Sequence, residues 1–341
     1  LGEDAGKCNT SGGKNIFAGL YAGKCMQSGS YNIGFGMGAL AGSGTPGDNT
    51  GGYNIAIGYE GGCAITSGTQ NILLGGGRPG GSITSGGYNI ILGHKAGNTY
   101  TESSSVFIGR CAAQYMLTGG SSIAIGNEAG RCACKSDASI FIGRAAGKCA
   151  CDSSHGQIFI GDYAGKGNST MADVEGDNNI AIGGAAMCNY TTGHTNIVMG
   201  YSAGTGLTTG FENVIIGYKA NQAALTGQQN VFIGKCAGAC NTAGMYNNFF
   251  GMNAGKYNTT SDNDVMIGGN AGCCASPSYS AVLIGYNAGR GASGAAKHTG
   301  AGTIAIGGNA GCVITTGTFN TYMGESAGRC QCSGGHNIGI G

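Results

Sequence analysis

A short repeat that runs the whole length of the chain constrains its fold more than any other feature. Gly200, Gly217 and Gly234 each close an apolar stretch and stand 17 residues apart. Equivalent glycines recur every 16 to 18 residues over most of the chain and 22 residues apart at three places. A fixed short period is typical of repeat proteins, in which each copy packs against its neighbours. These landmark glycines are Gly2, Gly19, Gly36, Gly58, Gly75, Gly93, Gly109, Gly126, Gly143, Gly161, Gly183, Gly200, Gly217, Gly234, Gly251, Gly268, Gly285, Gly307, Gly324 and Gly341.

Each copy carries the same residue types around its landmark glycine. Asn usually stands four positions earlier, apolar residues three and one earlier, and Ala three later. One copy is too short to form a core, because a strand of about five residues covers less than half of it. Stacking copies as coils buries the apolar columns, with strands about 4.8 Å apart. Residues 1–341 are therefore predicted to form a single all-β segment, a parallel β-solenoid of about 19 coils of about 17 residues.

Two interpretations are open for the Asn column. The Asn side chains could hydrogen-bond to the neighbouring coil and form a ladder along the solenoid. Alternatively, Asn could stand there only because it is favoured in turns.

A longer period is superimposed on the short one. The 22-residue steps run from 36 to 58, from 161 to 183 and from 285 to 307, so they recur every seven coils, about 124 residues apart. The extra residues predict projecting loops at 43–52, 168–177 and 292–301. Cys63, Cys188 and Cys312 each follow such a loop, and we expect these loops and cysteines to contact adjacent chains. The alternative is an inherited duplication with solvent-exposed loops and free thiols.

The middle position of each strand forms a second apolar column. Because Ile197 and Met199 point to one face, Val198 must point to the other. Strands that are apolar on both faces are buried on both faces, so we expect other chains to cover this column. The alternative is a wide coil whose own turn folds over it. The interface candidates are Phe17, Phe107, Phe141, Phe159, Ile215, Phe232, Phe249, Cys63, Cys188 and Cys312.

Composition argues against several functional classes. Glycine makes up 73 of 341 residues and the formal net charge is +1, so no electrostatic case exists for nucleic acid or an anionic membrane. No apolar run approaches the roughly 20 residues of a membrane-spanning helix. The five His residues lack a plausible acid partner nearby, and no Ser/His/Asp or Cys/His constellation stands out. We therefore expect no catalytic site and no cofactor.

The 16 cysteines gather on the turns. Residues of one column in adjacent coils lie about 4.8 Å apart, within the Cα separation that a disulfide needs. This spacing suggests the pairs Cys8–Cys25, Cys132–Cys149 and Cys134–Cys151, with Cys312–Cys330 one residue out of column. Such disulfides suit an oxidising, extracellular setting. The alternatives are a metal site formed by Cys132, Cys134, Cys149 and Cys151, and free thiols.

The unit Asn-Ile-x-Ile-Gly-x-x-Ala-Gly followed by Thr-Thr-Gly resembles repeats of fibre proteins from phages and large viruses. It is also similar to the repeats of YadA-like trimeric adhesin heads, which form left-handed parallel β-rolls. The copies at 54–58 and 179–183 match best, although the period of 17 is longer than that of the adhesins and those relatives are not cysteine-rich. The resemblance implies a left-handed solenoid, a trimeric state and a location on a virion or cell surface.

These observations favour a structural fibre or filament protein, self-assembling and adhesive, at an extracellular or virion surface. The expected partners are copies of the chain, lateral fibre partners, and a cell-surface receptor or glycan. One alternative is an ice-binding solenoid that uses its Thr columns. Another is a tailspike-like solenoid with a glycan-binding or hydrolytic surface. Because the chain begins and ends inside repeats, we expect it to be a segment of a longer polypeptide.

Overall fold

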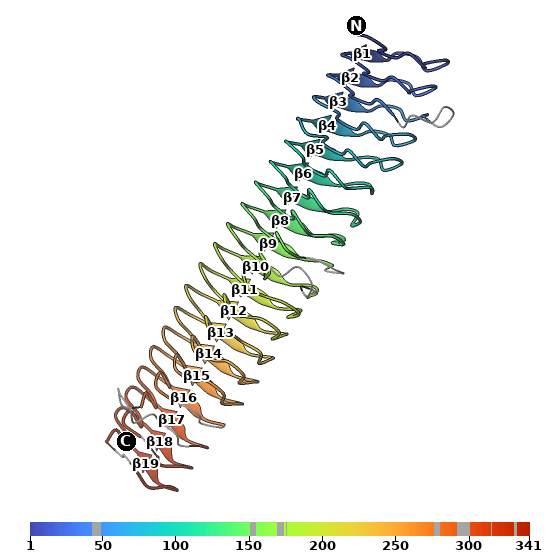
Figure 1. Ribbon diagram of the computed structural model, residues 1–341. Coiled ribbons are helices and arrows are strands. Elements are labelled where there is room, and N and C mark those ends of the chain that lie inside the picture. The colour runs from blue at the N-terminus through green and yellow to red at the C-terminus, as the bar shows by residue number, and fades with distance from the viewer. Residues whose placement is uncertain are drawn as a thin grey trace. The chain divides into compact units, whose positions relative to one another are not determined.

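The computed structural model describes residues 1–42, 49–150, 155–168, 174, 176–275, 280–291, 301–314, 316–330 and 333–341. Contacts divide the chain into two compact units, unit 1 at Leu1–Asp177 and unit 2 at Asn178–Gly341. In both units the regular elements are short parallel strands, one in each coil (Figure 1). The predicted β-solenoid fold is therefore confirmed for each unit.

The described residues of unit 1 contain nine three-residue strands, and each pairs in parallel with the next one of the unit. They are β1 (Ile16–Ala18), β2 (Ile33–Phe35), β3 (Ile55–Ile57), β4 (Ile72–Leu74), β5 (Ile90–Leu92), β6 (Val106–Ile108), β7 (Ile123–Ile125), β8 (Ile140–Ile142) and β9 (Ile158–Ile160). The register is exact from coil to coil, so that Phe141 pairs with Phe159.

Unit 2 repeats this arrangement, with ten strands in the part that the structure describes. They are β10 (Ile180–Ile182), β11 (Ile197–Met199), β12 (Val214–Ile216), β13 (Val231–Ile233), β14 (Asn248–Phe250), β15 (Val265–Ile267), β16 (Val282–Ile284), β17 (Ile304–Ile306), β18 (Thr321–Met323) and β19 (Ile338–Ile340). Val198, Ile215, Phe232 and Phe249 stand in one register column. The predicted loops at 43–52, 168–177 and 292–301 lie largely outside the described residues.

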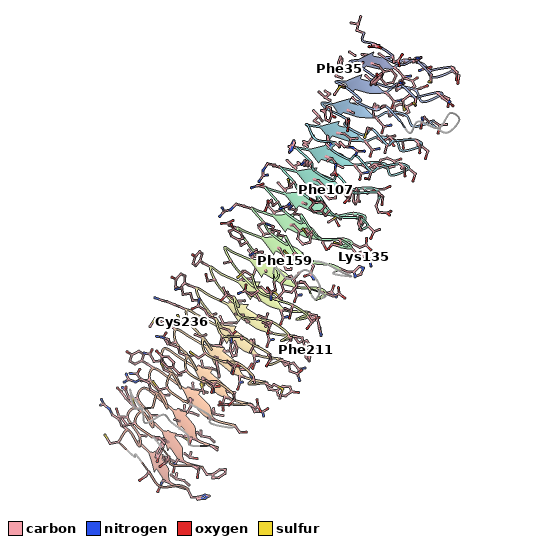
Figure 2. The ribbon with its side chains drawn as sticks, in the orientation of Figure 1. Phe35, Phe107, Lys135, Phe159, Phe211 and Cys236 are labelled. Carbon is pink, nitrogen blue, oxygen red and sulfur yellow. The ribbon has the colours of Figure 1, made fainter. Side chains whose placement is uncertain are left out.

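The middle residue of each strand points into its own coil, which corrects the prediction of an intermolecular interface. Val198 is fully buried, whereas Ile197 is 38% exposed. Phe107, Phe141, Phe159, Ile215, Phe232 and Phe249 are likewise fully buried within the chain, and Phe17 in β1 is half-buried (Phe107 and Phe159 are labelled in Figure 2). The turn of the same coil covers this column, as the alternative interpretation had it. Alternation along a strand separates two faces but does not say which face is inside when both are apolar.

The core consists of three columns of side chains. Where one column contains a large side chain, the neighbouring positions contain small residues. Besides the strand residue, the core contains the Ala three positions after the landmark glycine and an apolar residue farther along the turn. The aromatic rings lie against a glycine, since a Cβ at Gly147 would be 2.3 Å from Phe141 Cδ1. Where the strand residue is Ala305, Ile314 fills the space, and a Cβ at Gly311 would be 2.7 Å from its Cδ1. Volume is therefore conserved across columns, as close packing requires.

An Asn ladder runs beside the core, as the first interpretation of this column predicted. In unit 2 the backbone N–H of Asn213 donates to Oδ1 of Asn196 at 3.0 Å, and Nδ2 of Asn213 donates to the same oxygen at 3.1 Å. Nδ2 also donates to the carbonyl oxygen of Gly227 on the turn that follows β12. The pattern repeats at Asn230 and, in unit 1, at Asn71 and Asn89. The ladder fixes the register between coils and ties each strand to the turn that closes the core.

Candidate binding surface

The outward face of each sheet is the largest regular apolar surface that the strands present. The first and third residues of every strand are exposed or half-buried, in contrast to the buried middle residue. Most of these outward residues are Ile or Val, and none carries a charge along the strands that the structure describes. The two outward columns in unit 2 are Ile180, Ile197, Val214, Val231, Asn248, Val265, Val282, Ile304, Thr321 and Ile338, and Ile182, Met199, Ile216, Ile233, Phe250, Ile267, Ile284, Ile306, Met323 and Ile340.

Strand geometry makes this outer face a regular grid. Neighbouring side chains of one column are about 4.8 Å apart, and the two columns are about 7 Å apart along the strand. The nine strands of unit 1 alone span roughly 40 Å, so its face covers about 400 Å² in projection for a width of about 10 Å. Apolar patches of this size on soluble proteins commonly mark interaction sites.

The sequence contained a signal for the inward face that alternation alone did not reveal. Asn196 and Val198 are two residues apart in an extended segment, so their side chains point to the same side. An Asn whose amide bonds to turn carbonyls must lie inside the coil, and the middle strand residue must lie there with it. The outward face is then the Ile/Val face.

The predicted cysteine pairs lie on the turn side, with no disulfide bond among the described cysteines. Cys8 and Cys25 are free thiols on adjacent coils, and burial, followed by the neighbouring Cys8 thiol, raises the pKa of the Cys25 thiol. Burial also raises the pKa of the Cys132 and Cys149 thiols. Cys149 and Cys312 are free thiols as well. The pair Cys134–Cys151 falls outside the description because Cys151 is not among the described residues. The disulfides thus stay predictions.

The alternative of a metal site gains no support from the geometry. Among the described residues, no three His, Cys, Asp or Glu side chains come together as a set of metal ligands. Cys132, Cys134 and Cys149 belong to this part of the chain, whereas Cys151 lies outside the described residues. Vicinal Cys273 and Cys274 lie together in unit 2, where burial raises the pKa of the Cys273 thiol and the Cys274 thiol adds to this effect.

The three cysteines proposed for lateral contacts differ in exposure. Cys63 and Cys188 are half-buried, and Cys312 is buried. In unit 1, Cys63 lines a pocket of about 530 Å³ together with Lys24 and Cys25, and the Arg78 guanidinium donates to its Sγ at 3.4 Å. Both cations at this pocket already have carboxylate partners, Asp4 for Lys24 and Glu60 for Arg78. No uncompensated charge is left there to select a ligand.

Charged residues gather on the bends between the strand and the turn. In unit 1, Glu128 forms ion pairs with Lys148 at 2.6 Å, Arg131 at 3.1 Å and Arg110 at 3.8 Å. The hydrogen bond from Lys148 lowers the pKa of the Glu128 carboxyl. In unit 2, Lys219 and Lys235 instead lie over the ring of Tyr218. These charged side chains lie on the bends, and the strands beside them carry no charge on their outward residues.

One Thr column serves the backbone of the turns, whereas Thr209 and Thr260 at the next position are exposed. The hydroxyl of Thr191 donates to the carbonyl oxygen of Thr208 at 3.2 Å, and that of Thr242 donates to Thr259 at 3.1 Å. Thr66 and Thr226 make the same contact with the coil that follows. These hydroxyls stabilise coil stacking, so they are not a free hydroxyl array.

No protein-family model, curated protein or solved structure matches the chain. The described residues also include no helix that is long and apolar enough to cross a membrane.

Proposed function

We propose that the protein is a structural, non-enzymatic element of a fibre or filament, and that it assembles through the outer face of its solenoid. The observation that carries this proposal is the sheet that is apolar on both sides. The inward column forms the core, while the outward Ile and Val side chains have no covering element in the described chain. Parallel strands with two apolar faces are usually covered on both of them.

A second copy of the chain is the occupant that this face suits best. The face carries no charge, so it offers no attraction to a polyanion or to a charged peptide. Another solenoid presents the same spacing of about 4.8 Å, so its side chains interdigitate over the full length of the face, with the sheets about 10 Å apart. The outer face of unit 1 alone, about 400 Å² in projection, is about half of the area that one partner contributes to a standard protein interface.

The setting that we propose is an extracellular or virion surface, where the fibre contacts a receptor or glycan. This part rests on the likeness of the repeat to those of phage and large-virus fibres and of trimeric adhesin heads. In such an oxidising setting, the paired turn cysteines would act as staples between coils.

The test is to place charges on the outer face and to measure the mass of the assembly by light scattering. We expect the parent chain to be larger than a monomer and the double variant Val282→Lys/Ile284→Lys to be monomeric, since lysines in an apolar interface lose their hydration. The control is Thr209→Lys/Thr260→Lys, which adds the same charge on exposed turn positions. Circular dichroism shows whether all three proteins are folded. A monomeric parent chain over the accessible concentration range contradicts the proposal.

Ice binding is a second candidate, and one observation favours it. The outer face is a regular, flat array of β-branched side chains, although it is not the Thr array that the sequence suggested. Thermal hysteresis of the purified chain distinguishes the two functions. Hysteresis that the Val282→Lys/Ile284→Lys variant loses, in a protein that stays monomeric, supports ice binding over assembly.

A further inference from the structure

Three coils of unit 2 depart from the Ile/Val pattern of the outer face: β11 only at its third position, with Met199, and β14 and β18 at both outward positions. β14 presents Asn248 and Phe250, and β18 presents Thr321 and Met323. Every other outward residue from β13 to β19 is Ile or Val. Phe250 is 38% exposed and Met323 is 42% exposed. β14 and β18 stand two strands to either side of β16 in the parallel register.

The polar outward residues of β14 and β18 have no hydrogen-bond partners for their side chains in the described part of the chain. Asn248 and Thr321 use their backbone N–H groups in the ladder between coils, and neither side chain forms a hydrogen bond within the described part of the chain. Covering them with an apolar surface would leave an amide and a hydroxyl without hydrogen-bond partners, which is unfavourable. A self-assembly interface on this face must therefore pair them with polar groups.

We propose that unit 2 packs face to face with unit 2 of a second copy around a twofold axis that lies along β16. This inference rests on the proposed function and adds the register of the contact. Rotation about an axis along the strand reverses the order of the coils but preserves position along the strand. β14 then faces β18 of the second copy, β15 faces β17, and β16 faces itself. Asn248 comes to lie opposite Thr321 of the second copy, and Phe250 opposite Met323 of the second copy.

In this register the polar residue of β14 faces the polar residue of β18, and the apolar residue of β14 faces the apolar residue of β18. The Asn248 amide gains a hydroxyl as its hydrogen-bond partner, and the Met323 thioether packs against an aromatic ring, a favourable contact. The other face-to-face twofold arrangement has its axis along the solenoid. It brings each coil against the same coil of the second copy and places the first position opposite the third. Asn248 would then face Phe250, and its amide would be buried without a partner. Buried polar residues of this kind commonly set the register of an interface.

Charge pairing tests the register directly. In a chain with Asn248→Lys alone, lysine faces Thr321 of the second copy, and in a chain with Thr321→Glu alone, glutamate faces Asn248. We expect each single variant to raise the dimer dissociation constant by about 100-fold. The double variant places lysine opposite glutamate twice, and we expect its dissociation constant to return to within about tenfold of the parent value. Sedimentation velocity over a concentration series gives all four constants.

Two controls separate contact between copies from effects within one chain. Residues 248 and 321 are four coils apart, roughly 19 Å, beyond the Debye length of about 8 Å at physiological salt, so rescue cannot arise inside one chain. An equimolar mixture of the two single variants should form heterodimers. The matched variant Asn248→Lys/Ile304→Glu should show no rescue, because β17 faces β15.

The possible outcomes are distinct. Rescue by Thr321→Glu and not by Ile304→Glu supports the register. A parent chain that assembles while neither pair is rescued overturns the register and leaves the proposed function standing. A parent chain that stays monomeric overturns both.

Discussion

At the landmark glycine, backbone conformation and packing both exclude a side chain. Gly307 has a φ of 132°, in a region that L-residues rarely adopt, and a Cβ there would lie 2.4 Å from the carbonyl oxygen of Gly324 in the next coil. The same contact recurs from coil to coil, since a Cβ at Gly217 would lie 2.4 Å from Gly234 O. The glycine column therefore allows the bends to stack directly on one another.

Gly307→Ala should destabilise unit 2 by about 1–3 kcal/mol, because both the strain and the contact with Gly324 must be relieved. Its neighbour Gly308 offers a matched control. A Cβ at Gly308 would come no closer than 4.0 Å to Glu325 Cγ, so Gly308→Ala should be nearly neutral. Equal losses of stability in urea unfolding would show that glycine content, and not this position, matters.

The inward and outward strand positions should respond differently to truncation. Phe159→Ala removes a fully buried ring and should cost about 3–5 kcal/mol, since its neighbours cannot fill the cavity. Ile158→Ala truncates a half-buried outward side chain and should cost less than about 1 kcal/mol in the monomer. Urea unfolding measured under monomeric conditions compares the two variants. A reversed order of the two losses would contradict the assignment of the faces.

At the scale of one coil, the Asn ladder joins strand, turn and neighbour. The Oδ1 of Asn213 accepts both the backbone N–H and the side-chain amide of Asn230, each at 3.0 Å. At β15 the column contains Asp264, which is fully buried and accepts from the side chain of Asn258 and the backbone of Ala281. Asp264 thus still accepts from the backbone of the next coil, while Asn258 supplies a donor from the turn.

Asn213→Ala should leave the Asn230 N–H and the Gly227 carbonyl without partners inside the coil. Each unsatisfied buried group costs about 1–3 kcal/mol, so the loss should exceed that of an ordinary surface substitution. Hydrogen exchange should show faster exchange at the amide of Asn230 than in the parent chain. Exposed Gln222→Ala on the turn of the same coil provides the comparison, and an unchanged Asn230 amide would mean that the ladder adds little.

The Cys8–Cys25 pair should form a disulfide when glutathione disulfide is supplied. The two thiols then lose two protons and two electrons, and two glutathione thiols are released. Because the pKa of Cys25 is raised, its thiolate is scarce at neutral pH, and the reaction should accelerate as the pH rises through the alkaline range. Mass spectrometry without reduction identifies the linked peptides, and Cys8→Ser is the control. Glutathione adducts on both cysteines without a link would contradict the pairing.

At the scale of the whole molecule, the features that could be predicted from the sequence are those that recur in every coil. The period, the glycine bends and the Asn column are dictated by local geometry, so the β-solenoid could be predicted. The inward face could not be read from alternation, because Val198 and Ile197 are both apolar and only the ladder bonds of Asn196 distinguish their sides. The residues that replace Ile and Val at β14 and β18 can be interpreted only when it is known that this face of the strands points outward.

The seven-coil period predicts a longer spacing along an assembled fibre. Cys188 and Cys312 belong to unit 2 and stand 124 residues apart, seven strands along the register, which places their coils roughly 34 Å apart. Cys312 is buried in its own chain, so the coils, and not this thiol, would make the contact. If the coils at these positions contact neighbouring chains, lateral packing repeats at that distance. Diffraction from aligned fibres should then show a meridional reflection near 4.8 Å from the coils and a layer line near 34 Å. A 4.8 Å reflection without the longer spacing would mean that the seven-coil block reflects duplication alone.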